Sequence, residues 1–244
     1  MTGKLYVVAT PIGNLEDITL RALSVLKQVD LILAEDTRVT KKLLDHYDIQ
    51  KPLRSYHQHS SQYTKYYILN ILAEGKNIAL VTDAGTPGIS DPGNELIDYL
   101  LTSQSQVDSP SRAASRQPVE SHADFFEVVP IPGPSALTAA LSVSGMNTNR
   151  FVFLGFMPKK GRTKLVSWLK EGKVPFAFYE SPKRLPKTLK ALAELFEYQG
   201  SIVVGRELTK KFESIYRGSF QEVMEKLGKD DLKGEAVVII DPHK

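Results

Sequence analysis

The sequence predicts an α/β protein in two parts, a largely parallel α/β unit followed by a second α/β unit with a mixed sheet. In the first part, short apolar runs alternate four times with loops and helical patterns. This strand, loop, helix alternation is typical of a parallel sheet with helices on its faces. The pattern changes after residues 144–147. We therefore expect an N-terminal unit over residues 1–145 and a C-terminal unit over residues 146–244.

The elements of the first unit follow from apolar periodicity and helix-start signals. Thr19 should cap the first helix, because a threonine hydroxyl can accept a hydrogen bond from a free amide group of the first turn. Pro134 suits the first turn of the last helix, where no amide donor is needed. We expect strands at residues 5–9, 31–34, 53–56, 78–81 and 126–130, and helices at residues 20–26, 40–44, 63–72, 95–101 and 134–143.

The second unit shows the same kinds of pattern in a different order. We expect strands at residues 151–156, 176–179, 202–207 and 236–240, a further short segment at 213–216, and helices at 164–169, 185–196 and 220–227. The cleft between the two units is the default ligand site, because pockets form preferentially at domain interfaces.

Residues 102–124 interrupt the first unit with a segment rich in Ser, Gln and Pro and nearly free of large apolar side chains. Such a segment buries too little surface to offset its ordering entropy. We predict a disordered or loosely held insert. It joins a helix to a strand and should therefore leave from the amino-terminal edge of the sheet, away from the ligand edge.

Composition excludes several classes of protein. The 244 residues are enough for a substantial core, and no run of about 18 apolar residues predicts a membrane span. The absence of cysteine excludes disulfides and thiolate chemistry, and together with an N-terminus unlike a signal peptide it fits a cytoplasmic protein. The net charge of +3 permits an anionic partner. Its basic residues gather in three places, at 159–164, 183–187 and 206–211.

The loop at residues 81–93 is the strongest local indication of a ligand site. It follows an apolar strand, holds three glycines and two prolines, and places Asp83 at the carboxyl end of that strand. Ligands of open α/β sheets bind at this edge, where glycines allow close approach to the backbone. The loops at 10–17, 35–38 and 132–136 should converge on the same edge. The alternative is an ordinary Gly/Pro turn in which Asp91 caps a helix.

Several familiar chemistries are missing. No Gly-x-Gly-x-x-Gly follows a strand, and neither a phosphate loop nor Gly-x-Ser-x-Gly occurs. His57 and His59 resemble a metal pair, but no further ligand motif supports a metal. We therefore expect no metal and a reaction that depends mainly on orientation of the reactants.

Taken together, the loops resemble one known family. The motifs that carry the resemblance, in chain order, are Thr10-Pro11-Ile12-Gly13-Asn14-Leu15-Glu16-Asp17-Ile18-Thr19, Ala34-Glu35-Asp36-Thr37-Arg38, the loop from Asp83 to Gly93, Pro132-Gly133-Pro134-Ser135-Ala136, Phe178-Tyr179-Glu180-Ser181, Arg206-Glu207-Leu208-Thr209-Lys210 and Lys233-Gly234-Glu235. They are similar to those of the ribosomal RNA small subunit methyltransferase I family, a branch of the tetrapyrrole methylase superfamily. The resemblance runs from about Leu5 to Lys244.

The resemblance implies two α/β domains of tetrapyrrole-methylase type with the cofactor, S-adenosylmethionine, in the interdomain cleft. It also implies a homodimer that methylates the 2′-oxygen of a cytidine in the decoding region of 16S rRNA. Two alternatives stay open. One is a tetrapyrrole (precorrin) methyltransferase, but sister branches carry Gly-Pro-Gly-Asp-Pro where this chain has residues 10–14. The other is a non-catalytic relative that binds RNA or a nucleotide, against which the intact 83–93 loop argues.

The resemblance also assigns roles to residues. Cofactor contacts are expected from Pro11, Asp83, Ala84, Gly85, Thr86, Ile89, Ser135, Ala136, Tyr179, Gly234, Glu235 and Ala236. Asp36 and Glu180 are the candidates for accepting the ribose proton. Substrate contacts are expected from Glu35, Arg38, Lys159, Lys160 and Arg162. The last three belong to a basic rim, made of the clusters at residues 159–164, 183–187 and 206–211, that is expected to face RNA. The alternatives are a structural ion pair for Glu35 and Arg38, and a turn cap for Glu180.

The sequence departs from the family pattern twice. The insert at residues 102–124 replaces a short loop, and the sequence ends at Lys244, where longer members continue into a further segment. If that segment helps docking on the ribosomal subunit, its absence affects substrate recognition rather than cofactor binding.

Overall fold

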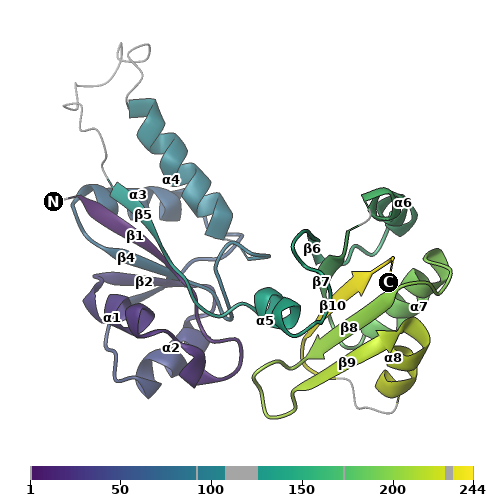
Figure 1. The fold of residues 1–244 in the computed structure, drawn as a ribbon. Helices are drawn as coiled ribbons and strands as arrows, with labels where there is room; N and C mark the ends of the chain where they lie inside the picture. Colours follow the sequence, from purple (N-terminus) through teal and green to yellow (C-terminus); the bar gives the residue numbers. More distant parts are fainter. Residues whose placement is uncertain (1, 92, 108–125, 173, 229–232, 244) are drawn as a thin grey trace. The chain divides into compact units, whose positions relative to one another are not determined.

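A computed structural model of the chain describes residues 1–244 except residues 1, 92, 108–125, 173, 229–232 and 244. The chain forms two compact units (Figure 1). Unit 1 comprises Met1–Pro11 and Leu15–Pro134, and unit 2 comprises Ile12–Asn14 and Ser135–Lys244. The short segment 12–14 thus belongs to the second unit, although it lies early in the sequence.

Unit 1 is built on a five-stranded parallel sheet in the order β3-β2-β4-β1-β5. The strands are β1 (Gly3–Val8), β2 (Leu31–Ala34), β3 (Leu53–Ser55), β4 (Ile78–Val81) and β5 (Phe126–Ile131). The helices are the 3-10 turn η1 (Leu15–Asp17), α1 (Leu20–Gln28), α2 (Thr37–His46), α3 (Gln62–Ala73) and α4 (Gly93–Val107). The predicted parallel sheet is therefore confirmed.

Helices cover both faces of this sheet, as all-parallel sheets require. Helices α1 and α2 lie on one face and α3 and α4 on the other (Figure 1). Along β4, Ala79 and Val81 pack toward the first pair, whereas Ile78 and Leu80 pack toward the second. The alternation follows from the two-residue period of a strand.

Polar side chains start three of the helices. Thr19 accepts from the amide of Ala22, as predicted, Asp36 accepts from that of Arg38, and Ser61 accepts from that of Thr64. Each cap satisfies an amide group that has no partner within its own helix. The Asp36 cap also fixes this carboxylate at the carboxyl end of β2.

Unit 2 holds a mixed sheet in the order β6-β7-β10-β8-β9, as expected. Strand β6 (Val152–Phe156) pairs in parallel with β7 (Phe176–Glu180), and β10 (Ala236–Asp241) runs antiparallel to both β7 and β8 (Ser201–Arg206). The edge strand β9 (Ser214–Ser219) is antiparallel to β8. The helices are α5 (Ala136–Ser142), α6 (Arg162–Gly172), α7 (Leu185–Leu195) and α8 (Phe220–Leu227).

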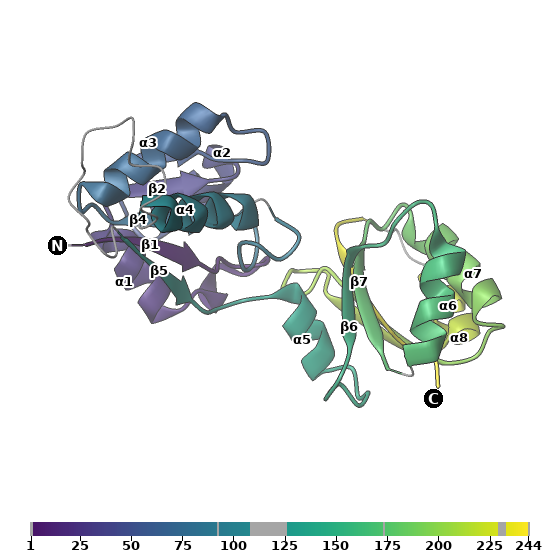
Figure 2. The ribbon, with the colours of Figure 1, turned by 90° about the horizontal axis from the view of Figure 1, so that it is seen from above.

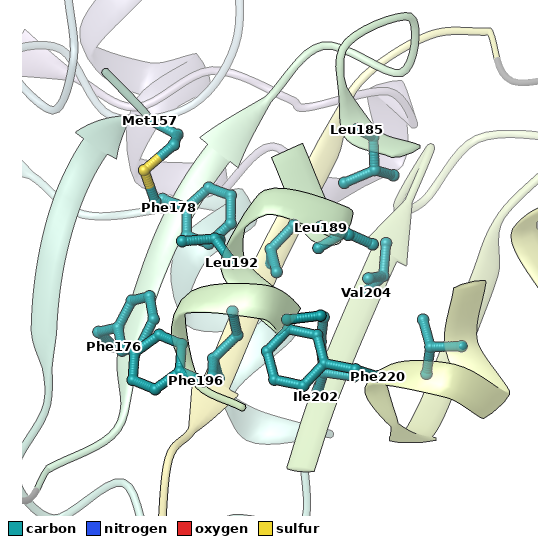
Figure 3. Packing of buried hydrophobic residues seen from close by; sticks show 14 of the residues in the cluster. Met157, Phe176, Phe178, Leu185, Leu189, Leu192, Phe196, Ile202, Val204 and Phe220 are labelled. Atoms are coloured by element: carbon teal, nitrogen blue, oxygen red, sulfur yellow. The ribbon is translucent and has the colours of Figure 1, made fainter. Parts of the chain in front are cut away.

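Two cores form on the two faces of this sheet. Helices α6, α7 and α8 lie on one face and α5 on the other (Figure 2). On β10, Val238 and Ile240 point into the larger core, whereas Val237 and Ile239 pack toward α5. Figure 3 shows the larger core, in which the rings of Phe176 and Phe196 stack with centroids 5.7 Å apart.

The structure differs from the expected domain boundary. The units divide at Pro134–Ser135 rather than after residue 145, so α5 belongs to unit 2. The reason is packing, because Leu137, Ala140 and Leu141 bury the apolar face of α5 against the second sheet.

Two further expectations need correction. Helix α5 begins at Ala136 with Ser135 as its N-cap, so Pro134 precedes the helix. Helix α4 continues to Val107, so residues 102–107 are helical and not part of a loose insert. The rest of the predicted insert, residues 108–124, lies outside the described residues.

We expect Phe178→Ala to destabilise unit 2. Phe178 is fully buried in the larger core. Truncating a buried phenylalanine typically costs about 3–5 kcal/mol, because transfer energy is lost and a cavity remains. Urea unfolding followed by circular dichroism measures the change. Phe212→Ala, at a ring that is 68% exposed, is the matched control, and equal midpoints for the two variants would contradict this core.

Candidate functional site

The carboxyl ends of three adjacent strands, β4, β1 and β5, are joined by backbone hydrogen bonds. Thr10 and Gly85 exchange a pair of them, with the Thr10 amide 2.9 Å from the Gly85 oxygen and the Gly85 amide 3.1 Å from the Thr10 oxygen. On the other side, the Ala9 amide donates to the Ile131 oxygen at 3.2 Å. The loops after β1 and β4 are thereby held together beyond the ends of their strands.

Buried threonine hydroxyls extend this connection sideways. The Thr10 hydroxyl donates to the Thr82 oxygen at 3.0 Å, and the Thr82 hydroxyl donates to Glu35 Oε2 at 2.8 Å. Thr10 is 3% exposed and Thr82 is 4% exposed. These roles were not predicted from the sequence, where a threonine beside a strand gives no sign of its tertiary partner.

The 83–91 loop has a constrained backbone. Gly85 and Gly88 have φ angles of 88° and 85°, in the left-handed region that favours glycine. A Cβ on Gly88 would collide with Asn94 Oδ1, and the Asn94 side chain donates to the Gly88 oxygen at 2.7 Å. The conformation therefore needs these glycines, independently of any ligand.

The loop leaves part of its length open to solvent. Asp83 and Ala84 are exposed and Ile89 is 37% exposed, whereas Gly85 and Pro87 are buried. Thr86 is half-buried, and its hydroxyl donates to the Pro134 oxygen at 3.2 Å. Of the residues expected to contact the cofactor, the structure thus brings Asp83, Ala84, Gly85, Thr86 and Ile89 together in one loop, beside Thr10 and the buried Pro11.

The connections from β1 and β4 diverge at this point. Helix α1, which follows β1, lies on one face of the sheet, and α4, which follows β4, lies on the other (Figure 1). Neighbouring parallel strands whose helices turn to opposite faces create a crevice, the usual ligand position in open α/β sheets.

Three carboxylates gather at the ends of β2 and β4. The Asp36 amide donates to Asp83 Oδ1 at 2.9 Å, and Glu35 accepts the Thr82 hydroxyl. Partial burial raises the pKa of Asp83 above its ordinary value, and the negative charges of Glu35 and Asp36 raise it further. An excess of negative charge at this edge favours a cationic ligand.

Arg38 forms an ion pair with one of these carboxylates, Asp36. Its guanidinium forms a fork with Asp36, with Nη2 to Oδ2 at 2.6 Å and Nε to Oδ1 at 3.0 Å. This contact and the cap to the Arg38 amide lower the pKa of Asp36 to about 2. The alternative of a structural ion pair between Glu35 and Arg38 is therefore wrong, because Arg38 pairs with Asp36 and Glu35 accepts the Thr82 hydroxyl.

In unit 2, Tyr179 lies in a row of aromatic rings. Its ring meets those of Phe153 and Phe156 edge-on, with centroids 5.1 and 5.6 Å away. Ser135 is the N-cap of α5 in an extended conformation, its side chain makes no capping hydrogen bond, and Ala136 starts the helix.

A charged clamp holds the turn that contains Gly234 and Glu235. Lys210 Nζ lies 2.9 Å from Glu207 Oε1 and 3.2 Å from Glu235 Oε2, and the Glu235 amide donates to Glu207 Oε1 at 3.0 Å. Gly234 has a φ of 87°, and a Cβ there would collide with Glu207. Lys210 is thus an internal cross-link rather than a free cation of the predicted rim.

The same loop receives the segment 12–14. The Asn14 amide donates to Thr209 Oγ1 at 3.2 Å, and Gly13 lies so close to Lys210 that a Cβ would collide with its side chain. Ile12 is buried against the α5 side of the sheet. These contacts explain why residues 12–14 belong to unit 2.

The carboxylate of Glu180 is fully buried and surrounded by donors. Oε1 accepts the Ser181 amide at 2.8 Å, while Oε2 accepts the Thr188 hydroxyl at 2.8 Å and lies 3.1 Å from Arg184 Nη2. These contacts match the alternative given for Glu180, in which its side chain caps the turn between β7 and α7.

Two side chains of the predicted basic rim are tied to the scaffold. Arg206 is 8% exposed, and Arg162 donates from Nε to the Pro158 oxygen at 2.8 Å. Lys159 and Lys160 are exposed. Within the described part of the chain, no group of three or more His, Asp or Glu side chains could hold a metal ion, and no helix is long and apolar enough to cross a membrane.

Comparison with known proteins identifies the class. A family model described as Tetrapyrrole (Corrin/Porphyrin) Methylases matches residues 4–224. The structure resembles that of a cobalamin biosynthetic enzyme, cobalt precorrin-4 methyltransferase, with a TM-score of 0.65, 16% identity and coverage of 97% of this chain and 94% of that chain. It also resembles uroporphyrin-III C-methyltransferase from Thermus thermophilus complexed with S-adenyl homocysteine, with a TM-score of 0.61, 17% identity and coverage of 98% and 92%. The fold is that of the tetrapyrrole methylases.

Closer relatives define the branch. Proteins named ribosomal RNA small subunit methyltransferase I are 42% identical in Thermotoga maritima, over 98% of this chain and 98% of the relative, and 42% identical in Bacillus subtilis, over 98% and 75%. The relative in Synechocystis is 44% identical over 98% of this chain and 78% of its own length. The chain belongs to the ribosomal RNA small subunit methyltransferase I family.

We expect Thr10→Val to weaken unit 1. The substitution keeps the shape but removes the donor to the buried Thr82 oxygen, and an unsatisfied buried polar group costs about 1–3 kcal/mol. Urea unfolding of the variant measures the loss, with Thr102→Val on the exposed side of α4 as control. Equal stability of the two variants would show that the hydroxyl does not hold the loops.

We also expect Glu35→Gln to lower the pKa of Asp83 toward its ordinary value of 3.8, because one neighbouring negative charge disappears while the amide can still accept from Thr82. Carbon-detected NMR titration of the carboxyl groups measures this shift. Glu74→Gln, whose carboxylate pairs with Lys76, is the control and should leave Asp83 unchanged.

The pKa shifts of Asp36 and Asp83 make the stability of the folded protein depend on pH in opposite directions. The lowered pKa of Asp36 stabilises the folded protein above pH 3.8, and this stabilisation is lost as the pH falls toward about 2. The raised pKa of Asp83 contributes stability at low pH that is lost as the pH rises through its folded value. An unchanged Asp83 titration in Glu35→Gln would contradict the electrostatic part of this description.

Proposed function

We propose that this protein transfers a methyl group from S-adenosylmethionine to the 2′-oxygen of a cytidine in the decoding region of 16S rRNA. The observation that carries the proposal is 42–44% identity, over 98% of the chain, to proteins named ribosomal RNA small subunit methyltransferase I. The cytidine and the 2′-position come from the family resemblance of the loop motifs.

The open edge of unit 1 suits the cofactor. S-adenosylmethionine carries a sulfonium and an ammonium group. Among the described residues, Arg38 is the one cation that forms an ion pair with the carboxylates of Glu35, Asp36 and Asp83, through Asp36. The pKa of Asp83 is raised by partial burial and, beyond that, by repulsion from Glu35 and Asp36, and a cationic ligand would relieve this repulsion. The exposed backbone around Ala84 offers polar groups with little side chain in the way.

The residues proposed to hold the cofactor in unit 1 are Pro11, Asp83, Ala84, Gly85, Thr86 and Ile89. In unit 2 the proposal includes Ser135, Ala136, Tyr179, Gly234, Glu235 and Ala236. The clamp through Lys210 would then keep the Gly234 turn in a fixed conformation.

The cofactor supplies an activated methyl group, so the protein needs chiefly to orient the ribose hydroxyl. As the carbon–oxygen bond forms and the carbon–sulfur bond breaks, the proton of the hydroxyl must go to an acceptor. Asp36, at the half-buried carboxyl end of β2, is the proposed acceptor. A carboxylate with a pKa of about 2 is a weak base, and it suits a proton transfer that occurs late in the reaction. Glu180 is the second candidate, but its carboxylate is fully buried and held by internal donors, whereas the Asp36 side chain is 27% exposed.

A tetrapyrrole methyltransferase is the second candidate function. The solved neighbours bear such names, but at 16–18% identity they share the fold alone. The first loop, Thr10 to Asn14, favours the ribosomal branch. The proposed substrate would place the protein in the cytoplasm with the small ribosomal subunit, and the resemblance adds a homodimer, which sedimentation equilibrium can test.

Calorimetric titration with S-adenosylmethionine tests the cofactor site. We expect Asp83→Asn to weaken binding at least about tenfold, since a hydrogen bond between charged groups contributes about 1.5–3 kcal/mol. Asp98→Asn, exposed on α4, is the control and should bind like the parent protein. Absence of binding by the parent protein would favour the non-catalytic alternative.

Transfer of a labelled methyl group tests the substrate. We expect labelling of small ribosomal subunits that lack the modification, and none of a precorrin substrate in a parallel reaction. The opposite pattern would identify a tetrapyrrole enzyme and reject the proposal.

A further inference from the structure

The end of β6 presents an aromatic ring to solvent. Phe156 is 58% exposed, although it ends a strand that pairs with the buried β7. Gly155 has a φ of 64°, and the register of β6 on β7 shifts between Phe153 and Phe156. A bulge of this kind re-aims the side chain that follows it. Here it places Phe156 opposite Tyr179, with the two rings edge-on at 5.6 Å.

Two loops lie side by side at this edge of the second sheet. The Met157 amide donates to the Tyr179 oxygen at 3.2 Å, and Arg184 Nη2 donates to the Met157 oxygen at 2.8 Å. Arg162 Nη2 reaches Thr188 Oγ1 at 3.3 Å. The β6–α6 loop, which carries Phe156 at its start, is therefore fixed against the β7–α7 connection.

The arginines of these two loops form hydrogen bonds within the loop structure, whereas the exposed lysines remain available to a partner. Between Met157 and Ala191 the sequence holds ten Lys or Arg residues and two Glu residues. One of the two, Glu180, is buried and paired with Arg184. Lys159, Lys160, Lys183 and Lys187 are exposed, and none of them forms an ion pair with another described residue.

Lys159 follows Phe156 by three residues, a span of at most roughly 10 Å. An exposed aromatic ring beside uncompensated cations is the arrangement that binds single-stranded nucleic acid, with a base stacked on the ring and phosphates on the cations. An adenosine cofactor without a phosphate would use the ring but not the lysines. The lysines thus favour a polynucleotide.

We propose that Phe156 stacks on an unpaired base of the RNA substrate while Lys159, Lys160, Lys183 and Lys187 bind the adjoining phosphates. This inference rests on the proposed function, of which it identifies an RNA-binding subsite. It differs from the rim expected in the sequence analysis, because Arg162, Arg184, Arg206 and Lys210 serve the scaffold and an aromatic ring joins the lysines.

The test uses the full chain and a fluorescently labelled, unstructured single-stranded oligoribonucleotide of about twelve nucleotides, measured by anisotropy over a range of salt concentrations. Phe156→Ala should weaken binding about 5- to 150-fold without changing the salt slope, since stacking on one base is worth about 1–3 kcal/mol. Lys183→Gln with Lys187→Gln should reduce the slope of log K against log salt by roughly 1.4, from two lost phosphate contacts.

Two matched controls remove trivial explanations. Tyr63→Ala truncates an aromatic ring on α3 that is 73% exposed, and the Lys27→Gln, Lys42→Gln pair removes the same net charge from exposed positions on α1 and α2. Both should bind the oligoribonucleotide like the parent protein. Calorimetric titration of Phe156→Ala with S-adenosylmethionine should give the parent affinity.

Three outcomes overturn the proposal. The first is that Phe156→Ala binds RNA like the parent protein. The second is that the salt slope of the Lys183→Gln, Lys187→Gln variant equals that of the Lys27→Gln, Lys42→Gln control. The third is that Phe156→Ala loses S-adenosylmethionine binding while its RNA binding stays intact. The last would assign the ring to the cofactor. If the parent protein shows these RNA dependences but methylates no subunit, the proposed function fails, and Phe156 and the lysines remain as a binding site for single-stranded RNA. If the parent protein methylates subunits while the variants bind RNA normally, the proposed function stands and this inference fails.

Discussion

The paired hydrogen bonds between Thr10 and Gly85 are the constraint on which the candidate site depends. They continue the contact of β1 with β4 past the ends of both strands, at the point where the following helices turn to opposite faces. Without them, the two Gly/Pro loops would leave the sheet independently. Each would then have more conformations, and ordering the loops around a ligand would cost more conformational entropy. The Thr10 and Thr82 hydroxyls then fix Glu35, and through the Asp36 amide the edge also fixes Asp83.

The charged groups of the two units are used in different ways. In unit 1, carboxylates remain in excess at an exposed edge, and the pKa of Asp83 is raised by its partial burial and then by the neighbouring negative charges. In unit 2, Lys210 and Arg184 neutralise their acidic partners inside loops, which leaves exposed lysines without compensation. A cationic cofactor and a polyanionic substrate suit these two surfaces, and electrostatic attraction of each would act on a different unit.

Much of this was accessible from the sequence because it depends on local signals. The bounds of β2, β4 and α8 are those predicted, since apolar runs and the residues that flank them determine where these elements begin and end. The meeting of the loops followed from parallel-strand topology. Three features could not be predicted from the sequence, because packing and contacts in the folded protein decide them. These are the assignment of α5 to unit 2, the burial of Glu180 and the pairing of Lys210 with two glutamates. Charge clusters in a sequence likewise do not reveal which cations are already paired.

Under the proposed function, a ribose of the small-subunit RNA is the methyl acceptor. Mass spectrometry of nuclease fragments, from subunits incubated with the protein and S-adenosylmethionine, tests it most directly. We predict one fragment heavier by a single methyl group, with the added mass on the ribose of a cytidine in the decoding region. A methyl group on a base, or on a nucleotide other than cytidine, would contradict the account.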